Sequence, residues 1–514
     1  MLRVFQNDLY EPDRFVVTLE LVPGREASGR AVDAVMGIAR DAFSDGRISA
    51  VSITDNPGGN PSLSPDVLGY EIFNIGMDVI VHFTCRDMNR VGMESRALQL
   101  ARMGMKNILA LSGDYSGQGF GGQGAPVFDL DSVQLQIMLD LLSERLDVAG
   151  DPDPFFAGCA VSPFKQTEAE CFAQYAKLCR KIGAGAKFVI TQLGYDARKF
   201  YELIQIQRHM GIQSPCLGSV YVLTPKAAAI MNSGRVPGAV VSGKLLKRVQ
   251  NEWTDTASGQ AAAIERAARL AAVLKGLGYR GIHIGGIHRR FDTVGLILDR
   301  LAQIENDWLA FVSEFNFPQP QNFYAFAHEF GVEAGPPAFG RSKEQIQLRE
   351  KLLYAMLSKT HDAFFNQEHR LGPLFHKLAK KMDHNIGRQL LKELVEDPAK
   401  QLILDCQKCG DCAIAHVGFL CPESQCPKHT RNGACGGSKE GRCEVFPERP
   451  CVWYRVYQRL NYANQTEQMV QDCVPPRMWE LNKTSSWLNF HMRRDHQGAS
   501  TDIAMRCRAG SCRL

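Results

Sequence analysis

The sequence lacks the features of several protein classes. No run approaches the roughly 18 uninterrupted apolar residues of a membrane-spanning helix, because Lys, Arg, Asp or Gly interrupts every candidate. Met1 to Phe15 has no apolar core before a small-residue cleavage site, so no secretory signal is recognisable. The net charge of +4 is close to neutral for 514 residues, and no basic stripe with interleaved aromatics is present. We therefore expect a soluble cytoplasmic protein without a membrane span and without nucleic acid as its main partner.

Two phosphate-binding patterns are missing as well. No Gly-x-Gly-x-x-Gly turn follows the first β-rich run, as a dinucleotide-binding sheet would require. No lysine follows the glycine-rich loop Ser116 to Gly124, so a mobile lid or a plain linker explains this loop better than a phosphate cradle. The most basic stretch, His376 to Arg388, is better explained as one exposed helix face than as a docking patch.

What the sequence does contain is a regular alternation of β-rich runs and amphipathic stretches up to about residue 305. The predicted strands are Phe15 to Leu21, Ile48 to Thr54, Asp78 to Thr84, Asn107 to Ser112, Phe155 to Val161, Lys187 to Gln192, Pro215 to Tyr221 and Gly281 to Gly285. The predicted helices include Gly29 to Phe43, Met88 to Met103, Ser132 to Leu146, Glu168 to Ile182, Ala197 to His209 and Ala257 to Leu277. Eight strands with helices between them predict an α/β fold, a (β/α)8 TIM barrel, with a doubly wound open sheet as the alternative.

The second half of the chain has a different character. A Pro-interrupted stretch after residue 305 is followed by long helical patterns, Lys343 to Leu357 and Gly372 to Leu394, and then by a cysteine-rich run. We expect a barrel over residues 1–305, a helical and cysteine-rich metal-binding domain over 306–475, and a tail over 476–514. The oligomeric state cannot be predicted from these patterns.

Eight of the sixteen cysteines form one run: Cys406, Cys409, Cys412, Cys421, Cys426, Cys435, Cys443 and Cys451. Two adjacent Cys-x2-Cys steps place three thiolates on one tight loop, the arrangement that an iron-sulfur cube needs. Eight thiolates suffice for two [4Fe-4S] clusters, and zinc in place of at least one cluster is the alternative. We expect no ligands among Cys473, Cys507 and Cys512, and we expect the five cysteines scattered in the barrel to be buried and structural.

Polar residues terminate the apolar runs of the predicted barrel, where the active site of such a fold lies. They are Glu20, Thr54, Asp55, His82, Thr84, Asp114, Gln192 and His283. A carboxylate in an apolar strand is costly unless it is neutral or paired, so Glu20 is either an acid of raised pKa or a salt-bridged structural residue. His82 is either a site residue or a hydrogen-bonded core histidine.

Several of these segments resemble methylenetetrahydrofolate reductase, a flavin-dependent barrel, over about residues 15 to 305. The matching segments are Leu19-Glu20-Leu21-Val22-Pro23, Val51-Ser52-Ile53-Thr54, His82-Phe83-Thr84-Cys85, Asn107 to Asp114 and Gly185 to Gln192. Two departures stand out. Ser112 replaces an arginine, and the segment Ala227 to Asn232 lacks the aromatic that stacks on nicotinamide in bacterial relatives. The second departure argues against direct NADH oxidation by the barrel.

The resemblance implies roles for individual residues. Glu20 would be the general acid that helps to open the methylene bridge of the folate, and Asp114 and Gln192 would bind the pterin. Asp114 would also place negative charge near the flavin, which is FMN or FAD. Further flavin contacts would come from Thr54, His82, Ser112 and Gly113, with Arg180 and Lys181 at the phosphate tail.

Residues Cys406 to Trp453 resemble the cysteine-rich domain that accompanies this reductase in acetogens and related anaerobes. There it is thought to hold iron-sulfur clusters and to link the barrel to an electron-donating partner. Three hypotheses follow. The first is a reductase that converts 5,10-methylene-tetrahydrofolate to 5-methyl-tetrahydrofolate with electrons from ferredoxin or a redox complex. The second is a methyltransferase, or the reverse oxidation of methyl-tetrahydrofolate in a demethylation pathway. The third is an NADH-dependent reductase whose C-terminal module binds structural zinc.

Overall fold

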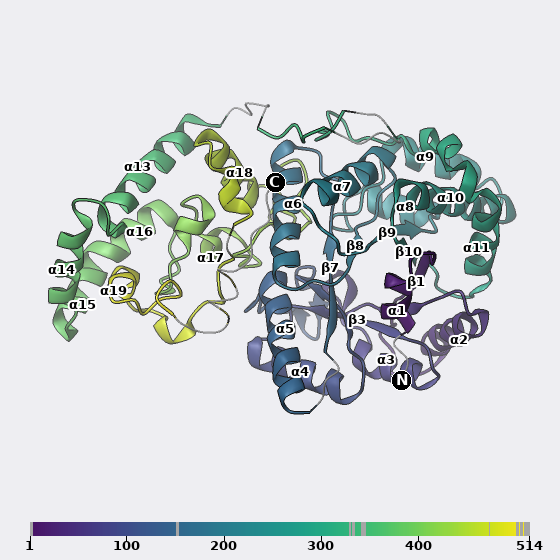
Figure 1. Ribbon diagram of the computed structural model, residues 1–514, viewed down its shortest axis with the longest axis horizontal. Coiled ribbons are helices and arrows are strands. Elements are labelled where there is room, and N and C mark those ends of the chain that lie inside the picture. The colour runs from purple at the N-terminus through teal and green to yellow at the C-terminus, as the bar shows by residue number, and fades with distance from the viewer. Residues whose placement is uncertain are drawn as a thin grey trace.

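Eight parallel strands close into a barrel in the computed structural model, which describes residues 4–150, 154–327, 330, 335–340, 346–471, 473–499, 503 and 507 (Figure 1). The strand order is β1-β10-β9-β8-β7-β4-β3-β2. The strands are β1 (Val16–Leu21), β2 (Ala50–Ile53), β3 (Val79–Thr84), β4 (Asn107–Leu111), β7 (Phe156–Val161), β8 (Val189–Thr191), β9 (Cys216–Tyr221) and β10 (Gly281–Gly285). The predicted TIM barrel is confirmed, because each predicted strand is found within two residues at both ends.

The interior of the barrel is closed at the N-terminal ends of the strands by helix α1 (Val4–Tyr10). Phe5 and Leu9 of α1 are buried in one cluster with inward-facing residues of the strands, and the Phe5 ring lies edge-on to Phe188 at 5.2 Å. Arg280, just before β10, donates a hydrogen bond to the Leu9 carbonyl at 2.7 Å. With this end filled by apolar side chains, a ligand site in the barrel is confined to the opposite end, as in other parallel barrels.

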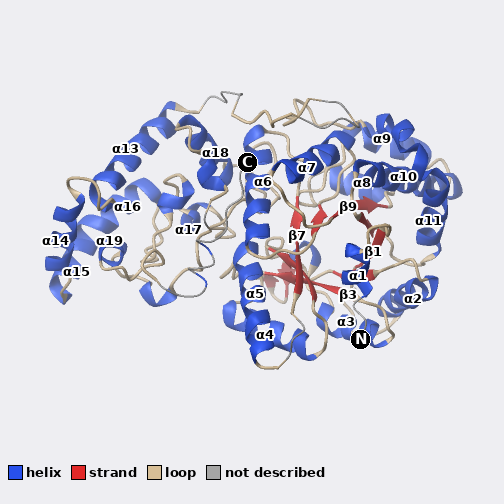
Figure 2. Ribbon diagram, viewed as in Figure 1, coloured by secondary structure: helices blue, strands red, loops and turns tan. Residues whose placement is uncertain are grey.

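Helices surround the barrel and alternate with its strands (Figure 2). They are α2 (Arg30–Asp45), α3 (Pro65–Asn74), α4 (Arg90–Arg102), α5 (Ser132–Val148), α6 (Glu168–Gly183), α7 (Ala197–His209), α8 (Pro225–Asn232), α9 (Gly243–Glu252), α10 (Thr256–Leu277) and α11 (Asp292–Ile304). The six predicted helices are present, and the structure adds α3, α8, α9 and α11. The glycine-rich loop forms a small hairpin of β5 (Gln118–Gly119) and β6 (Gly122–Gln123) with Phe120 exposed at its tip.

The C-terminal part is a layer of helices against cysteine-rich loops, at the end of the molecule away from the barrel (Figure 1). Its helices are α13 (Leu348–Phe365), α14 (Gly372–Met382), α15 (Asn385–Leu391), α16 (Asp397–Leu404), α17 (Pro422–Gln425), α18 (Val452–Tyr462) and α19 (Ser486–His491). The pattern Gly372 to Leu394, predicted as one helix, breaks after Met382. It breaks there because the His384 side chain caps a new helix by accepting from the Gly387 amide.

Residues expected to form a tail pack into this part. Met478 and His496 both donate backbone hydrogen bonds to the Asp411 carboxylate, at 3.3 and 3.1 Å. Cys473 and Cys507 are joined by a disulfide, a bond that the sequence pattern did not indicate, and Cys512 lies outside the described residues. None of the helices in the described ranges combines the length and the apolar character that crossing a bilayer would take.

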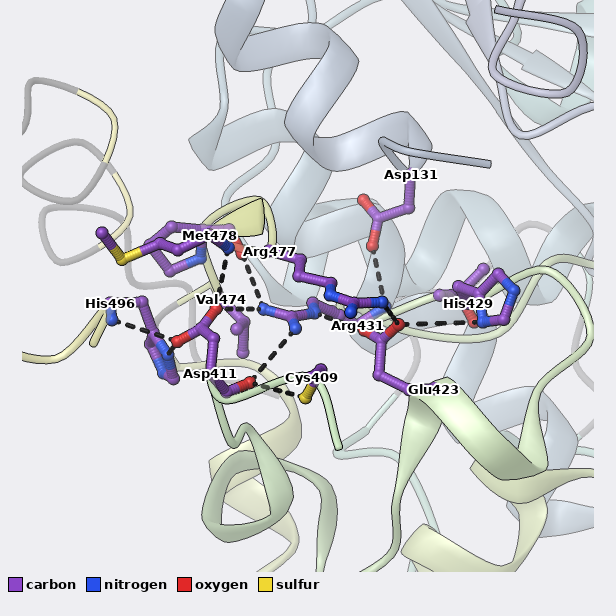
Figure 3. Close-up of polar contacts among 12 residues, drawn as sticks. Asp131, Cys409, Asp411, Glu423, His429, Arg431, Val474, Arg477, Met478 and His496 are labelled. Carbon is purple, nitrogen blue, oxygen red and sulfur yellow. Dashed lines mark hydrogen bonds and ion pairs between the residues drawn. The ribbon is translucent and has the colours of Figure 1, made fainter. Parts of the chain in front are cut away.

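The two parts are joined through Asp131, at the start of α5 (Figure 3). One carboxylate oxygen of Asp131 caps α5 by accepting from the Val133 amide at 2.9 Å and the Gln134 amide at 3.2 Å. The other oxygen accepts from the backbone amides of Arg431 at 3.1 Å and Asn432 at 2.9 Å. A single buried carboxylate therefore begins a barrel helix and fixes the loop between Cys426 and Cys435, the fifth and sixth predicted ligand cysteines.

The Arg431 side chain extends this junction into the C-terminal part. Its guanidinium donates to Asp411 at 2.9 Å and to Glu423 at 2.8 Å, and all three side chains are buried. Buried ion pairs of this kind are costly to break, because removing one partner leaves an uncompensated charge. The junction therefore connects the barrel to the loops that carry Asp411 and Glu423 through one continuous polar network.

We expect Asp131→Ala to reduce the free energy of unfolding by roughly 3 kcal/mol, because it leaves the buried amides of residues 431 and 432 without acceptors and removes a helix cap. Chemical denaturation followed by circular dichroism measures this loss. Asn89→Ala is the matched control, since Asn89 caps α4 but makes no contact across the junction; its cost should be about 1 kcal/mol. Equal losses in the two variants would contradict the importance of the junction.

Candidate active site

A cavity of about 550 Å³ lies at the C-terminal ends of the barrel strands. The predicted site residues that line it are Glu20, Thr54, Asp55, His82, Thr84, Ser112, Gly113, Asp114, Lys181, Gln192 and His283. They come from β1 and β10, from the ends of β2, β3, β4 and β8, and from α6. The fold therefore brings together eleven predicted residues that are as far apart as Glu20 and His283, and the volume is that of a small-molecule site.

Glu20 is the acid of this cavity. Its side chain is 27% exposed at the end of β1, and burial among the strand ends raises its pKa to about 7. Among the described residues the nearest ring nitrogen is His283 Nε2, 4.0 Å from Glu20 Oε2. Burial lowers the pKa of His283 to about 3, so this histidine is neutral and supplies no counter-charge. The raised pKa of Glu20 and the neutral ring of His283 favour the acid of raised pKa over the salt-bridged residue.

Several buried polar atoms around the cavity have no hydrogen-bond partner among the residues that the structure describes. They are Thr54 Oγ1, His82 Nε2, Ser162 Oγ and Gln174 Nε2. Burial lowers the pKa of His82 to about 4, so its ring is neutral. Unpaired buried polar groups are rare and usually await a ligand or water. This mixture of donors and acceptors suits a flat heteroaromatic ligand that itself presents both, such as a flavin ring or a pterin.

Asp114 occupies the loop after β4. Its Oδ2 accepts a hydrogen bond from the Gly58 amide at 3.0 Å, which leaves the other carboxylate oxygen for a ligand. Gly113 has a φ of +86°, a conformation that side-chain-bearing residues rarely adopt, and its carbonyl accepts a hydrogen bond from Lys428 Nζ at 2.7 Å. The loop that presents Asp114 is therefore held from the C-terminal part of the chain.

The C-terminal part supplies one wall of the cavity, which the sequence analysis did not predict. Lys428, Cys435, Gly436 and Glu444 line it together with the barrel residues. The buried Lys428 forms an ion pair with Glu444, and Lys165 of the barrel donates hydrogen bonds to the carbonyls of Gly436 and Ser438. Cys435 Sγ lies 3.3 Å from Glu444 Oε1. One predicted metal ligand thus borders the same space as Glu20.

Arg180 and Lys181 occupy different places although they are neighbours on α6. Lys181 borders the cavity, donates to the Ala160 carbonyl at 2.7 Å, and has its pKa lowered to about 8 by burial. Arg180 instead donates to the carbonyls of Gln471 at 3.1 Å and Gln468 at 3.0 Å, in the C-terminal part. The structure does not bring Arg180 to the cavity, and its contacts join α6 to the C-terminal part.

A second cavity of about 530 Å³ lies beside the first. It is lined by the segment 231–243 after β9 and by the segment 437–444 of the cysteine-rich part. Met231, Val236, Pro237, Gly437 and Glu444 line both cavities, so the two spaces adjoin. This second space lies between the barrel and the cysteine loops.

The eight clustered cysteines separate into two sets of four. Cys426, Cys435, Cys443 and Cys451 all line one small cavity next to the barrel mouth. Cys406, Cys409, Cys412 and Cys421 form the other set. Burial raises the pKa of Cys421 to about 11, and the neighbouring thiols of Cys412 and Cys406 raise it further. Within the described ranges, however, no three His, Cys, Asp or Glu side chains converge in a way that could hold a metal ion.

A cation accompanies the set of Cys406, Cys409, Cys412 and Cys421. Lys400 Nζ lies 3.6 Å from Cys412 Sγ, and it also contacts the buried Glu396 at 3.4 Å and Ser486 Oγ at 2.7 Å. A lysine fixed beside thiols stabilises their ionised form. Burial raises the pKa of Cys406 more than Lys400 lowers it, so the pKa values of Cys406, Cys409 and Cys421 remain above that of a free thiol.

The fold and the cavity together define a TIM-barrel protein with a protonatable carboxyl group at the end of its first strand. The methylenetetrahydrofolate reductase family model matches residues 6–301, and a second model, described as the methylene-tetrahydrofolate reductase C terminal, matches residues 389–480. The chain belongs to the methylenetetrahydrofolate reductase family.

Named relatives match parts of the barrel. A probable methylenetetrahydrofolate reductase (NADPH) of Caenorhabditis elegans is 29% identical over 160 residues, 31% of this chain and 22% of that protein. Methylenetetrahydrofolate reductase 1 of Schizosaccharomyces pombe is 28% identical over 174 residues, 33% of this chain and 27% of that protein. The chain thus spans less than a third of the length of these relatives. A Clostridium thermocellum structure, described as binding two copies of 5-methyl-5,6,7,8-tetrahydrofolic acid, aligns with a TM-score of 0.40 at 12% identity, over 59% of this chain and 99% of that one.

The raised pKa of Glu20 can be tested without turnover. We expect one carboxyl group to titrate with a midpoint near pH 7, because burial raises the pKa of Glu20 to about 7. Infrared difference spectroscopy across pH 5 to 9 follows the C=O stretch of the protonated acid. Glu20→Gln should remove this signal, whereas Glu444→Gln should leave it in place. A signal that survives in Glu20→Gln would assign the titration to another group.

Proposed function

We propose that this protein catalyses the flavin-dependent reduction of 5,10-methylene-tetrahydrofolate to 5-methyl-tetrahydrofolate. The observation that carries the proposal is Glu20, an acid with a pKa of about 7, in a cavity lined by the polar residues that match the family motifs. A general acid works best when its pKa lies near the working pH. FMN or FAD, when bound, supplies the hydride.

The chain's own residues have three tasks in this reaction. Glu20 holds the proton that the folate amine needs when the methylene bridge opens to an iminium ion. Asp114 and Gln192 accept hydrogen bonds from the donor edge of the pterin. Thr54, His82, Ser112, Gly113 and Lys181 line the rest of the cavity and would hold the flavin, and the unpaired Thr54 Oγ1 and His82 Nε2 support that assignment.

We infer further that the two cysteine sets hold iron-sulfur clusters, two of the [4Fe-4S] type, which deliver electrons from ferredoxin or another redox partner. The spacing of the cysteines and the cavity shared by Cys426, Cys435, Cys443 and Cys451 support this assignment. Cys435 also borders the barrel cavity, so this set is adjacent to the place where the flavin would bind. Zinc in place of one cluster remains the alternative composition.

The same site serves the reverse oxidation of methyl-tetrahydrofolate equally well, because a catalyst lowers the barrier in both directions. The NADH-dependent alternative has less support. Within Ala227 to Asn232, only Met231 lines the cavity, and a methionine cannot stack on nicotinamide as an aromatic ring does. The aromatic ring on this side of the cavity is Tyr221, at the end of β9.

Glu20→Gln should reduce folate turnover with a dye donor more than roughly 100-fold while flavin binding and dye reduction of the flavin persist, because the amide has no proton to give. In the native protein, kcat/KM should be constant below about pH 6 and fall about tenfold per pH unit above pH 7, since the protonated form is the active one. Stopped-flow and steady-state assays measure both. Undiminished folate turnover in Glu20→Gln would refute the acid role.

The metal assignment predicts about eight irons and one flavin per chain after anaerobic purification. Cys409→Ser and Cys435→Ser should each lose about half of the iron, because each removes a ligand from a different set. Cys159→Ala is the matched control, since this buried thiol lies in the barrel and should leave the iron content unchanged. Elemental analysis and visible absorbance measure the outcome. Zinc without iron would make the C-terminal part a structural module and return NADH to consideration.

A further inference from the structure

The outer helices α13 to α16 expose an unusual number of large apolar side chains. Twelve of them lie between residues 348 and 402: Leu348, Leu352, Met356, Phe364, Leu371, Leu374, Leu378, Ile386, Leu390, Leu394, Val395 and Leu402. On α13, α14 and the α15 region they recur three or four residues apart, which places them along one side of each helix. Exposed apolar groups on this scale mark a contact surface. We call these twelve residues the outer apolar surface.

The opposite sides of the same helices are already occupied. Tyr354 of α13 is buried, with its ring 5.7 Å from Phe419, and Ala379 of α14 is buried as well. Leu374 and Leu378 of α14 are 60% and 51% exposed, respectively. The helices are therefore held to the cysteine-rich loops by one face. On the outer apolar surface the Phe364 ring lies 4.0 Å from the Phe375 ring of α14, and the other eleven side chains are at least 44% exposed.

The charge around this surface is positive. Lys377, Lys380 and Lys381 of α14 are exposed, and no carboxylate of the described residues pairs with them. Four of the eight carboxylates between residues 348 and 405 are held in ion pairs, whereas Asp362, Glu368, Glu393 and Asp405 are exposed and form no ion pair with a described residue. Glu350 binds Arg455 and Arg459, Asp383 binds Arg388 and Arg494, and Asp397 binds Lys392. The surface thus combines leucines with unneutralised lysines.

The surface lies beside the outer cysteine set. Helix α16 ends at Leu404, two residues before Cys406, and Lys400 on the same helix is 3.6 Å from Cys412 Sγ. Figure 1 shows α13 to α16 at the end of the molecule farthest from the barrel. A protein bound here would meet Cys406, Cys409, Cys412 and Cys421 before any residue of the barrel cavity.

We propose that the outer apolar surface and the lysines of α14 form the docking site for an acidic electron-carrier protein. This inference rests on the proposed function. The basic stretch was first interpreted as a plain exposed helix face; the apolar side chains between its lysines change that interpretation. A second copy of the chain fits less well, because a symmetric contact about α14 would bring Lys377, Lys380 and Lys381 of the two copies together. An acidic partner is attracted by the same charges.

The test is binding of a purified, strongly acidic ferredoxin to the full-length, metal-loaded protein, measured by calorimetry at two salt concentrations. Wild-type protein should bind, with an affinity that falls as salt rises. Leu374→Gln with Leu378→Gln, and separately Lys380→Glu with Lys381→Glu, should each weaken binding at least tenfold. The matched controls are Val91→Gln on α4 and Lys247→Glu on α9, both on exposed barrel residues, which should bind normally.

Three results would overturn the proposal: no binding by the wild-type protein, unchanged binding by both double variants, or a wild-type dimer that the leucine variant separates in sedimentation velocity. A fourth result would assign the surface to a membrane instead. In that case the wild-type protein binds anionic vesicles but not ferredoxin, and the leucine variant no longer binds the vesicles. Dye-driven folate turnover, measured on the same preparations, separates the two proposals. A wild-type protein without dye-driven folate turnover would refute the proposed function. The docking site is tested by ferredoxin binding alone.

Discussion

The arrangement of the whole chain depends on one buried carboxylate. Asp131 begins α5 and at the same time binds the backbone amides of Arg431 and Asn432, which lie 300 and 301 positions later in the sequence. Arg431 then binds Asp411 and Glu423, which belong to the loops of the outer cysteine set (Figure 3). A buried charge that loses its partners raises the free energy of the folded protein. These contacts therefore hold the barrel and the cysteine loops in one relative position.

That position makes the active-site cavity a shared structure. The barrel alone supplies Glu20, Asp114 and Gln192, but Lys428 and Glu444 close one side, and Lys428 holds the Gly113 carbonyl. The contact between Lys428 and Gly113 joins a buried side chain to a backbone carbonyl. A small shift of the C-terminal part would therefore move the loop that carries Asp114. A chain in which the two parts were free to move could not maintain such a wall.

The sequence was sufficient for the barrel and for most of the cavity. Strand runs that end in polar residues predict both the fold and the location of Glu20, Thr54 and His82, because parallel strands present their C-terminal ends on one side. It was insufficient for Arg180, since successive helical residues point about 100° apart and only Lys181 faces the cavity. It could not reveal Lys428 either, because a contact across 315 positions leaves no local periodicity.

Helix α1 fills the barrel interior at the N-terminal ends of the strands with Phe5 and Leu9. Among the described residues, the opening left for small molecules is at the C-terminal ends of the strands, where Lys428, Cys435, Gly436 and Glu444 already form one side of the cavity. With a single opening, a folate and a soluble nicotinamide donor would have to enter and leave the cavity one after the other. Under the proposed function, the cysteine-rich wall would remove this conflict, because reducing equivalents would arrive through the protein while the folate stays in place.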